Sequence, residues 1–539
     1  MTNYLNKLLN KNQTPQNLPI PGTAMRPNSA GGYSFAVDDW QRLHRFLILG
    51  SEGGTYYISE RALTVENANA VLACIQRDDE RVVREIVAIS EAGRAPKNDP
   101  AIFALALVAS HGGTEARRAA MAALPQVCRT GTHLFQFATY AQSMRGWGRG
   151  LRRGVAGWYH ARDARGLVYQ LVKYRQRDGW THADTLRLAH PKPSAETQGM
   201  IFRWVTHRED AAWARDITPP EDAALAFIWA FERAQAAQDV ETIVKLIERY
   251  DLPREALPTQ WLNEAAVWDA LLVKMPLTAM IRNLGVMAKV GLLRAHSAAE
   301  LRVVKRLTDS EALRKARVHP IAMLSALRVY AQGRGVRGDG TWTPTSRVID
   351  ALDEGFYRAF QNVEPSGQRV MLALDVSGSM AAGVVAGVPG LTPRDASAAM
   401  ALVTARTESN YSMSAFQGQM VEINISARMR LDDVMKVISG LPFGATDCAQ
   451  PMLYALERKL AVDTFVIYTD SETWFGSIHP VQALRQYREQ MGIAARLVVV
   501  AMTSNGFSIA DPQDAGMLDV VGFDTATPQM ITDFARGQL

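Results

Sequence analysis

The spacing of apolar residues changes abruptly near Pro365, and this change restricts the possible folds more than any other feature. From about Asp38 to Arg314, apolar residues recur every three or four positions, as in DAALAFIWAFERA and VETIVKLIERY. Such spacing is typical of amphipathic helices. After Pro365, short apolar runs of strand length alternate with helical segments. Because 539 residues also exceed what one hydrophobic core usually accommodates, we predict a multidomain protein with two different folds.

The first part, residues 1–364, is predicted to be all-α. Helical segments separated by short breaks with Gly or Pro indicate stacked helix pairs of the HEAT type, although no strict repeat is visible. Residues 1–35 are polar and rich in Pro, Asn and Gly, so we expect an extended arm with little helix. A glycine-rich segment, YAQGRGVRGDGTW, interrupts the helices before SRVIDALDEGFYRAF resumes them.

The second part, residues 365–539, is predicted to be an α/β domain. Its strand-like runs are VMLALD, YSMSAF, TFVIYTD and RLVVVAMT, with helical segments around 394–408, 447–460 and 480–490 between some of them. This alternation is typical of an open, mainly parallel, Rossmann-like sheet covered on both faces. Thr392 is the expected N-cap of the first helix, with Pro393 and Asp395 in its first turn. The boundary between the two parts falls near 363–368.

Five oxygen-bearing side chains of this domain form a candidate metal site. Asp375 ends the run VMLAL and Asp470 ends TFVIYT, and in open α/β sheets ligands bind beyond the carboxyl ends of the strands. Ser377, Ser379 and Thr446 add neutral hydroxyl oxygens. This all-oxygen set with only two full charges suits Mg²⁺, and Mn²⁺ or Ca²⁺ are alternatives.

A basic, aromatic segment stands out in the helical part. Between Arg145 and Arg187 it holds ten Lys and Arg, three Asp, and six Trp or Tyr. Charge beside aromatic planes suits single-stranded nucleic acid, whereas the alternative is a solvated basic face above buried tryptophans. On a helical projection one face carries Arg145, Arg149, Arg152 and Arg153, another carries Lys173 and Arg177, and the inward face carries Trp147, Leu151, Val155 and Trp158.

Charge and cysteine content narrow the possible partners and compartment. Residues 365–539 carry a net charge of −5 and the rest of the chain +10, so a polyanion is the obvious partner of the helical part. Cys74, Cys128 and Cys448 lie far apart and match no disulfide framework or zinc spacing. The amino terminus has no apolar core of signal-peptide length, and no apolar run is long enough to span a membrane. We expect a cytoplasmic protein.

These segments together resemble the sixty-kilodalton Ro autoantigen family and its bacterial relatives, which carry the TROVE module. The matching stretches cover nearly the whole chain in the family's order. They include RFLILGSEGGTYY, RGWGRGLRRGVAGWY, KYRQRDGWTHADTLRLAHPKP, PLTAMIRNLGVMAKVGLL and HPIAMLSALRVYAQGRG, followed by the stretches DVSGS, GATDC and YTDSE. The last three fill the five positions of the metal-ion-dependent adhesion site of von Willebrand factor A domains.

The resemblance implies a ring of HEAT-like helical repeats whose ends are bridged by a von Willebrand factor A domain. It also implies that small noncoding Y RNAs bind the outer basic surface and that single-stranded 3′ ends of misfolded RNAs enter the central hole. By position, the leading RNA contacts are Lys173, Arg177 and His190, which match the family's KxxxR and RLxH elements. Arg187 begins the RLxH element, and the charge argument adds Arg145, Arg149, Arg152 and Arg153.

For the metal site, the resemblance implies that the two serines and the threonine contact the ion directly and that the aspartates act through water. One position then stays open for an oxygen of a partner. A 3′-to-5′ exoribonuclease is a further expected partner, and the ring is expected to be a monomer without catalytic activity. The competing interpretations are a metal-dependent protein-binding module, with the ring as scaffold, and a Mg²⁺-dependent nuclease. Two acidic ligands and no evident general base argue against the nuclease.

Overall fold

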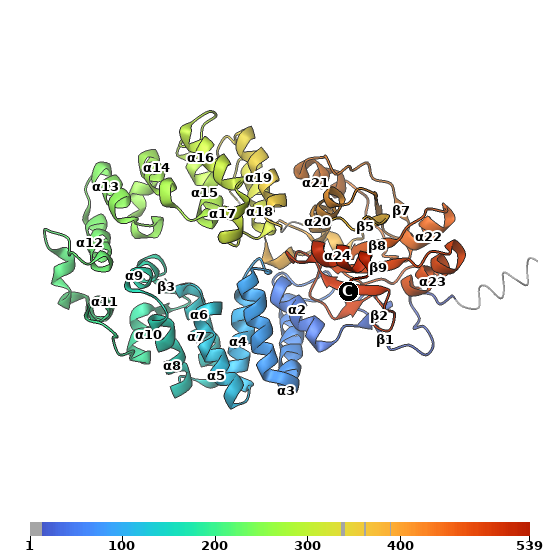
Figure 1. The fold of residues 1–539 in the computed structure, drawn as a ribbon, viewed down its shortest axis with the longest axis horizontal. Helices are drawn as coiled ribbons and strands as arrows, with labels where there is room; N and C mark the ends of the chain where they lie inside the picture. The colour runs from blue at the N-terminus through green and yellow to red at the C-terminus, as the bar shows by residue number, and fades with distance from the viewer. Residues whose placement is uncertain (1–12, 336–339, 361–362, 389) are drawn as a thin grey trace, which may run out of the picture.

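The computed structural model describes residues 13–335, 340–360, 363–388 and 390–539. Its helices follow one another along an arc that leads away from the C-terminal domain and returns to it (Figure 1). In chain order they are α2 (Asp39–Leu49), α3 (Glu60–Ala92), α4 (Asp99–His111), α5 (Thr114–Ala122), α6 (Leu124–Val127), α7 (Gly131–Arg145), α8 (Arg149–His160), α9 (Ala164–Lys173), α10 (His182–Ala189), α11 (Glu196–Thr206), α12 (Ala223–Ala236), α13 (Val240–Tyr250), α14 (Ala265–Lys274), α15 (Leu277–Lys289), α16 (Ala298–Leu307), α17 (Ser310–Lys315), α18 (Pro320–Ala331) and α19 (Ser346–Arg358).

The helical part matches the prediction from apolar spacing, with one local exception. Gln176–Arg177 (β3) and Trp180–Thr181 (β4) form an antiparallel hairpin between α9 and α10. The hairpin turn consists of Asp178 and Gly179, both with positive φ. Asp-Gly is the usual sequence of a two-residue hairpin turn, so this departure from helix has a local cause in the sequence.

The C-terminal domain is built on a sheet with the order β11-β9-β8-β5-β6-β7. The strands β5 (Val370–Asp375), β6 (Tyr411–Phe416), β8 (Thr464–Thr469), β9 (Arg496–Ala501) and β11 (Met517–Val521) run parallel, and β7 (Met420–Val421) pairs antiparallel with β6 at one edge. β5 and β8 are buried along their whole length, which explains their continuous apolar sequence. The four predicted strands are confirmed, whereas β7 and β11 were not predicted.

Helices cover the sheet as expected for this class of fold (Figure 1). The three predicted helices are present as α20 (Pro393–Thr407), α22 (Gln450–Glu457) and α23 (Pro480–Met491), and α21 (Leu431–Ser439) and α24 (Thr527–Arg536) accompany them. Thr392 and Asp395 form the predicted capping box at the start of α20. α20 is buried along nearly all of its length because it lies between the sheet and the helical part, and Arg328 of α18 donates to Asp395 at 2.7 Å.

The N-terminal arm is extended, as predicted, but it belongs to the C-terminal domain in space. β1 (Met25–Pro27) and β2 (Tyr33–Ala36) form an antiparallel pair, and β2 also pairs with β10 (Phe507–Ser508). Residues 1–12 of the predicted arm lie outside the described residues. The arm therefore joins the beginning of the chain to a loop more than 460 residues later.

Ion pairs close both ends of the helical arc onto the C-terminal domain. Near the start of the arc, Arg45 of α2 pairs with Asp519 of β11, and Arg94 pairs with Asp524. At its end, Asp350 of α19 pairs with Arg430. The two ends also touch directly, because the backbone oxygen of Arg94 and Nε2 of His319 lie 3.0 Å apart. The arc is therefore a closed ring that the α/β domain completes.

Cys74, Cys128 and Cys448 are all buried and free of disulfides. Among the described residues, no helix is long and apolar enough to cross a membrane.

Candidate metal centre and basic surface

The five predicted metal ligands lie together at the carboxyl end of the sheet. Asp375 ends β5 and Asp470 follows β8, its neighbour in the sheet. The Oγ atoms of Ser377 and Ser379 are 3.2 Å apart. The backbone N–H of Gly378 donates to the oxygen of Gly444 at 3.4 Å, which brings the loop of Thr446 beside the serine loop. All five side chains are buried, so an ion there would be shielded from bulk water.

Without a bound cation, burial and mutual repulsion disfavour the charged forms of the two aspartates. Burial, and then the nearby Asp470 carboxylate, raises the pKa of Asp375 from its ordinary value of 3.8 to about 7. Burial also raises the pKa of Asp470. Thr469 Oγ1 donates to Asp375 at 2.6 Å, and the N–H of Ser377 donates at 2.9 Å. These bonds orient the carboxylate but leave its charge poorly compensated.

The donor set fits a divalent cation of the Mg²⁺ type. A bound cation would offset both the burial of the two carboxylates and their mutual repulsion. Three of the five donors are hydroxyls, and the described part of the chain has no group of three His, Cys, Asp or Glu side chains positioned to hold a metal. When bound, Mg²⁺ would supply a Lewis-acidic centre able to accept one further oxygen ligand.

Glu472, two residues after Asp470, is fully buried beside this site. Burial, and then the charge of Asp470, raises its pKa to about 7. Its Oε2 accepts from the N–H of Ser29 at 2.8 Å, and its Oε1 accepts from Asn505 at 3.2 Å. Its burial could not be read locally, because the covering residues come from the N-terminal arm and from the loop after β9.

Tyr57 is a second residue near the site that sequence reasoning missed. Burial, followed by the charges of Asp470 and Glu472, raises its pKa to about 12. Tyr57 lies in the loop between α2 and α3, within the stretch SEGGTYY. The helical part therefore contributes a phenol to the surroundings of the metal site.

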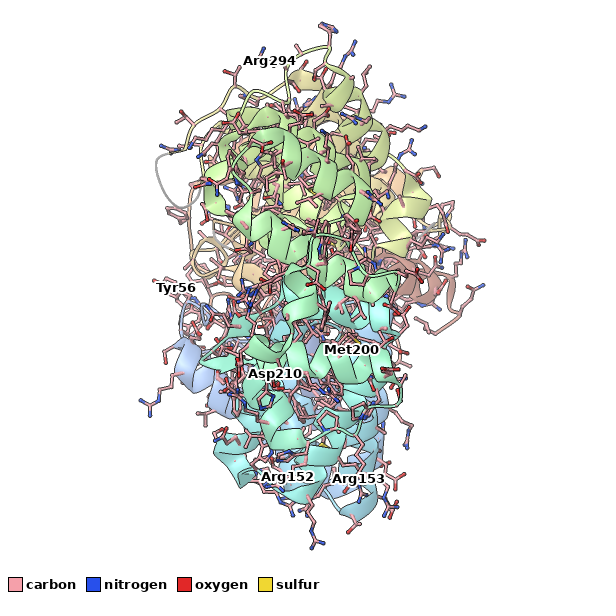
Figure 2. All side chains as sticks on the ribbon, turned by 90° about the vertical axis from the view of Figure 1, so that its left-hand side faces the viewer. Tyr56, Arg152, Arg153, Met200, Asp210 and Arg294 are labelled. Carbon is pink, nitrogen blue, oxygen red and sulfur yellow. The ribbon has the colours of Figure 1, made fainter. Side chains whose placement is uncertain are left out.

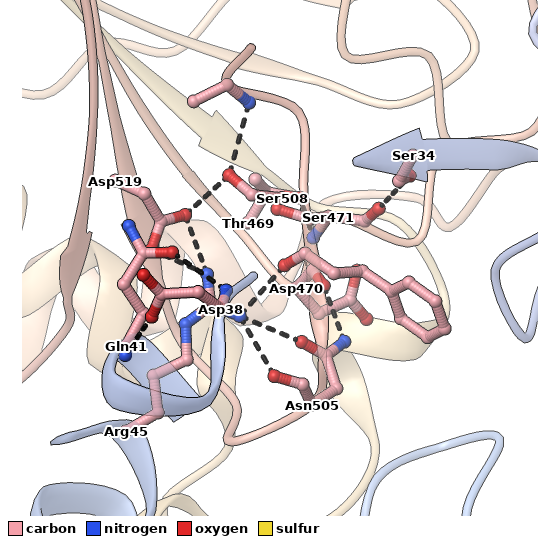
Figure 3. A network of polar contacts seen from close by, with 12 residues as sticks. Ser34, Asp38, Gln41, Arg45, Thr469, Asp470, Ser471, Asn505, Ser508 and Asp519 are labelled. Atoms are coloured by element: carbon pink, nitrogen blue, oxygen red, sulfur yellow. Dashed lines mark hydrogen bonds and ion pairs between the residues drawn. The ribbon is translucent and has the colours of Figure 1, made fainter. Parts of the chain in front are cut away.

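The N-terminal arm holds the loop that carries Asp470 (Figure 3). Ser34 Oγ donates to the backbone oxygen of Ser471 at 2.9 Å. Asn28 Nδ2 donates to the backbone oxygen of Thr473 at 2.7 Å. Ser471 itself has a φ of 61°, a left-handed conformation that is unfavourable for a residue other than glycine. External hydrogen bonds of this kind stabilise such a turn.

A buried polar network links the same loop to the helical part (Figure 3). Arg45 of α2 donates to the backbone oxygen of Asn505 at 3.0 Å and to both carboxylate oxygens of Asp519. Asn505 in turn donates to the backbone oxygen of Asp470 at 2.7 Å. Since Arg45 is almost fully buried, this network couples the position of α2 to the metal loop.

Replacing Asn28 by alanine tests the role of the arm. Asn28 is buried, donates to Thr473 and Ser34, and accepts from the N–H groups of Ala30 and Gly32. We expect Asn28→Ala to lower the free energy of unfolding by about 2 kcal/mol, since buried partners lose their hydrogen bonds, and to weaken Mg²⁺ binding. Thermal unfolding with and without Mg²⁺ measures both effects.

The exposed Thr23, which bonds only the nearby backbone of Ile20, provides the control, Thr23→Ala. Equal unfolding temperatures and equal Mg²⁺ responses for the two variants would contradict a supporting role of the arm.

The predicted arginine face is present, but it is formed by two helices rather than one. Arg145 ends α7, Gly146 caps that helix with a φ of 76°, and α8 begins at Arg149. Arg145, Arg149 and Arg153 nevertheless line one cavity of about 790 Å³. Figure 2 shows Arg152 and Arg153 at one end of the molecule, directed away from the helices. Within the described chain, the side chains have neither a hydrogen-bond nor an ion-pair partner in the case of Arg145, Arg149, Arg152 and Arg153.

The same cavity contains features that sequence reasoning missed. Arg117 and Arg118 of α5 also line it, and their adjacency in EARRAA was the available signal. Gly148, Gly150 and Gly157 have nothing within 4 Å of the position of a Cβ atom. The backbone of α8 is therefore open to close approach between the arginines.

The prediction that Lys173 and Arg177 share a helical face is wrong. α9 ends at Lys173, and Arg177 lies in β3, because the Asp-Gly turn folds this segment into a hairpin. Lys173 is half-buried, donates to Tyr169 Oη at 3.2 Å and lines a separate cavity of about 330 Å³. Arg177 is exposed, with Asp178 3.3 Å away.

Trp147 brings the remaining candidates near one another. Its ring stacks on Trp180 of β4 with centroids 5.5 Å apart, and its Nε1 donates to the backbone oxygen of Leu188 at 3.3 Å. Arg177 of the hairpin, and Arg187 and His190 at the end of α10, therefore flank this half-buried stack. Both Arg187 and His190 are exposed.

The inward face behaves as predicted in most positions. Leu151, Val155 and Trp158 are buried, whereas Trp147 is only half-buried. His182 is a packing residue, because burial lowers its pKa to about 3 and its Nδ1 lies 2.7 Å from Tyr159 Oη.

Comparison with known proteins gives a consistent result over the whole chain. Residues 26–328 match the TROVE domain, and residues 369–535 match the Ro60 vWA domain. The RNA-binding protein RO60 of Deinococcus radiodurans is 45% identical over 100% of both chains, and that of Caenorhabditis elegans is 37% identical over 95% of this chain and 90% of its own. The crystal structure of the Deinococcus radiodurans RO (RSR) protein matches with a TM-score of 0.70, over 93% of this chain and 100% of that one. The chain belongs to the Ro60 family, with a TROVE domain of helices closed by a vWA domain.

Proposed function

We propose that this protein is a non-catalytic, RNA-binding component of a cytoplasmic ribonucleoprotein that acts in RNA quality control. Small structured Y RNA binds the basic outer surface, and single-stranded 3′ ends of misfolded noncoding RNAs enter the centre of the ring. The observation that carries the proposal is the group of exposed arginines on α7 and α8, which have no acidic partner within the described residues. The names of both relatives, RNA-binding protein RO60, agree with it.

The chemistry of this surface suits RNA. Guanidinium groups bind phosphate oxygens through paired hydrogen bonds, and here they surround a backbone that glycines leave uncovered. The stacked Trp147 and Trp180 lie beside them, and exposed aromatic edges offer a surface for unpaired bases. Arg177, Arg187 and His190 extend the same surface across the hairpin and the end of α10.

The centre of the ring holds a cavity of about 860 Å³, with α4 and α7 on one side and α15 and α18 on the other. Its lining comes from the segment before α4, from α7, from α15 and from α18, with Val388 of the vWA domain at one side. Arg282 and Arg317 line it, and neither side chain has a hydrogen-bond or ion-pair partner among the described residues. Glu52 and Asp99 also line the cavity, so the two unpaired guanidinium groups, rather than a net positive charge, would hold the phosphates of a single strand.

The metal site has an accessory role in this proposal. Asp375, Ser377, Ser379, Thr446 and Asp470 hold Mg²⁺, and an oxygen of a partner completes its coordination. A 3′-to-5′ exoribonuclease is the partner that the proposed function requires to degrade the captured RNA. The support is the clustering of five oxygen donors and the uncompensated charge of the two aspartates.

A gel-shift titration tests RNA binding itself. We expect tight binding of a structured RNA with a single-stranded 3′ tail, with an affinity that falls steeply as salt increases, because phosphate contacts release counterions. Labelled RNA incubated with the protein and Mg²⁺ should stay intact. Absence of binding at low salt would refute the proposed function, and Mg²⁺-dependent cleavage that Asp375→Ala abolishes would show a nuclease instead.

A second candidate function is a metal-dependent protein-binding module with the ring as scaffold. It is favoured by the five oxygen donors that gather at the carboxyl end of the sheet, a set that can leave one position for an oxygen of a protein partner. Pull-downs with and without EDTA, compared with Asp375→Ala, distinguish this function. A protein partner that binds only the metal-loaded wild type, together with no RNA affinity, would favour it over RNA binding.

A further inference from the structure

A second cavity, of about 750 Å³, lies between the end of α15 and the beginnings of α16 and α19. Lys289, Arg294 and Arg347 line it, and all three are exposed. None of the three side chains has a hydrogen-bond or ion-pair partner in the described part of the chain. Three unpaired cations around one cavity form a site for an anion.

Among the described residues that line the cavity, the only acidic side chain is that of Glu300, which is almost fully buried. Its Oε2 accepts from the backbone N–H of His296 at 2.7 Å, so part of its charge is already compensated. The cavity therefore keeps a net positive charge.

The start of α19 adds to this positive potential. Thr345 is the N-cap of the helix, but its side chain makes no capping hydrogen bond. Ser346 and Arg347, the first two helical residues, line the cavity. The first N–H groups of a helix have no partner within it, and they favour a nearby anion.

Trp342 connects this cavity to the centre of the ring, because it lines both. Its Nε1 donates to the backbone oxygen of Tyr330 at 3.0 Å, and its ring stacks on Tyr330. A Cβ atom on Gly285 would lie 2.7 Å from the indole, so the indole rests directly on α15. The tryptophan is thus a fixed aromatic wall between the two cavities.

We propose that the phosphates of a single-stranded RNA segment, continuing from the central cavity past Trp342, bind Lys289, Arg294 and Arg347. This inference rests on the proposed function and extends it to a second contact on the same RNA. RNA is the occupant that satisfies both features, since its phosphates match the cations and its bases can contact the partly exposed indole of Trp342. Figure 2 shows Arg294 at the opposite end of the view from Arg152 and Arg153, so this contact is separate from the arginines of α8.

Binding of RNAs that differ only in the length of the 3′ tail tests the proposal. One structured RNA carries no tail, a short tail of about 4 nucleotides, or a long tail of about 16 nucleotides. The variant is Lys289→Ala/Arg294→Ala/Arg347→Ala. The control, Arg26→Ala/Arg61→Ala/Arg485→Ala, removes the same charge from exposed arginines outside the cavity.

We expect the wild type and the control to bind the long-tailed RNA more tightly than the others. The cavity variant should bind the long-tailed RNA roughly tenfold more weakly than the wild type does. The slope of log affinity against log salt concentration should be shallower by about 2, because three phosphate contacts on a single strand are lost at about 0.7 each. The affinity of the cavity variant for the tailless RNA should be unchanged. An equal loss in the control, an equal loss for all three RNAs, or no loss would overturn the inference.

Two further outcomes separate the possible explanations. If the wild type binds none of the RNAs, the proposed function fails as a whole. If the wild type and the cavity variant bind the long-tailed RNA with equal affinity, only this inference is overturned. Thermal unfolding with inorganic phosphate, at constant ionic strength, checks for a site that takes free phosphate. Inorganic phosphate could raise the unfolding temperature of the wild type but not that of the cavity variant, while the long tail strengthens RNA binding equally in both proteins. That result would overturn RNA as the occupant.

Discussion

Replacing Lys173 and Arg177 together by alanine is expected to weaken binding of structured RNA about 100-fold, since each charge-assisted bond to phosphate contributes roughly tenfold. The two residues act from different elements, the end of α9 and the β3–β4 hairpin. Lys173 is held above the rings of Tyr169 and Tyr174, at 5.3 and 5.6 Å from their centroids. Arg177 is exposed beside the Trp147–Trp180 stack.

The measurement is a salt-dependent binding titration of the double variant. Its double-logarithmic salt slope should be shallower by about 2, because two phosphate contacts are lost. Arg61→Ala/Arg485→Ala, which removes two exposed arginines elsewhere, should bind RNA as the wild type does. Unchanged affinity in Lys173→Ala/Arg177→Ala, with normal thermal unfolding, would show that the RNA contacts lie elsewhere.

Replacing Asp375 by asparagine should reverse the order of stability between variant and wild type when Mg²⁺ is added. Without metal at pH 8, the variant should be the more stable, because the repulsion between Asp375 and Asp470 disappears. With saturating Mg²⁺, the wild type should be the more stable, since a ligand at 100 times its Kd contributes about 2.7 kcal/mol. Thermal unfolding in EDTA and in Mg²⁺ measures both, and RNA affinity should stay unchanged.

The same site predicts a pH dependence for the metal-free protein. The folded pKa of Asp375, about 7, lies above its ordinary value of 3.8, so the folded state binds more protons than the unfolded state between these values. In EDTA, its contribution to stability should therefore fall as pH rises from about 4 to 7 and then level off.

Asp375→Asn should flatten this fall, with the remainder assigned to Glu472, whose pKa is also about 7, and to Asp470, whose pKa is raised by burial. A stability order that does not change with Mg²⁺ would contradict the assignment of Asp375 to a metal site.

Local pattern was sufficient for much of this protein. The period of the apolar residues predicts the helices of the ring, and β5 and β8 follow from continuous apolar runs. The clustering of Asp375 and Asp470 also follows, because parallel neighbouring strands end at the same edge of a sheet. The capping box of Thr392 and Asp395 is local by nature. Each of these features depends on residues a few positions apart or on a general rule of sheets.

Other features depend on residues that are distant in the chain. The burial of Glu472 requires Ser29 of the arm and Asn505 of the loop after β9. The cavity that collects Arg145, Arg149 and Arg153 requires a helix break at Gly146 and the packing of α5 on α8. The ring closes at one end through Arg45 with Asp519 and Arg94 with Asp524, and at the other end through Asp350 with Arg430. A local pattern carries no information on such pairs, because their proximity arises only when all the intervening elements have packed.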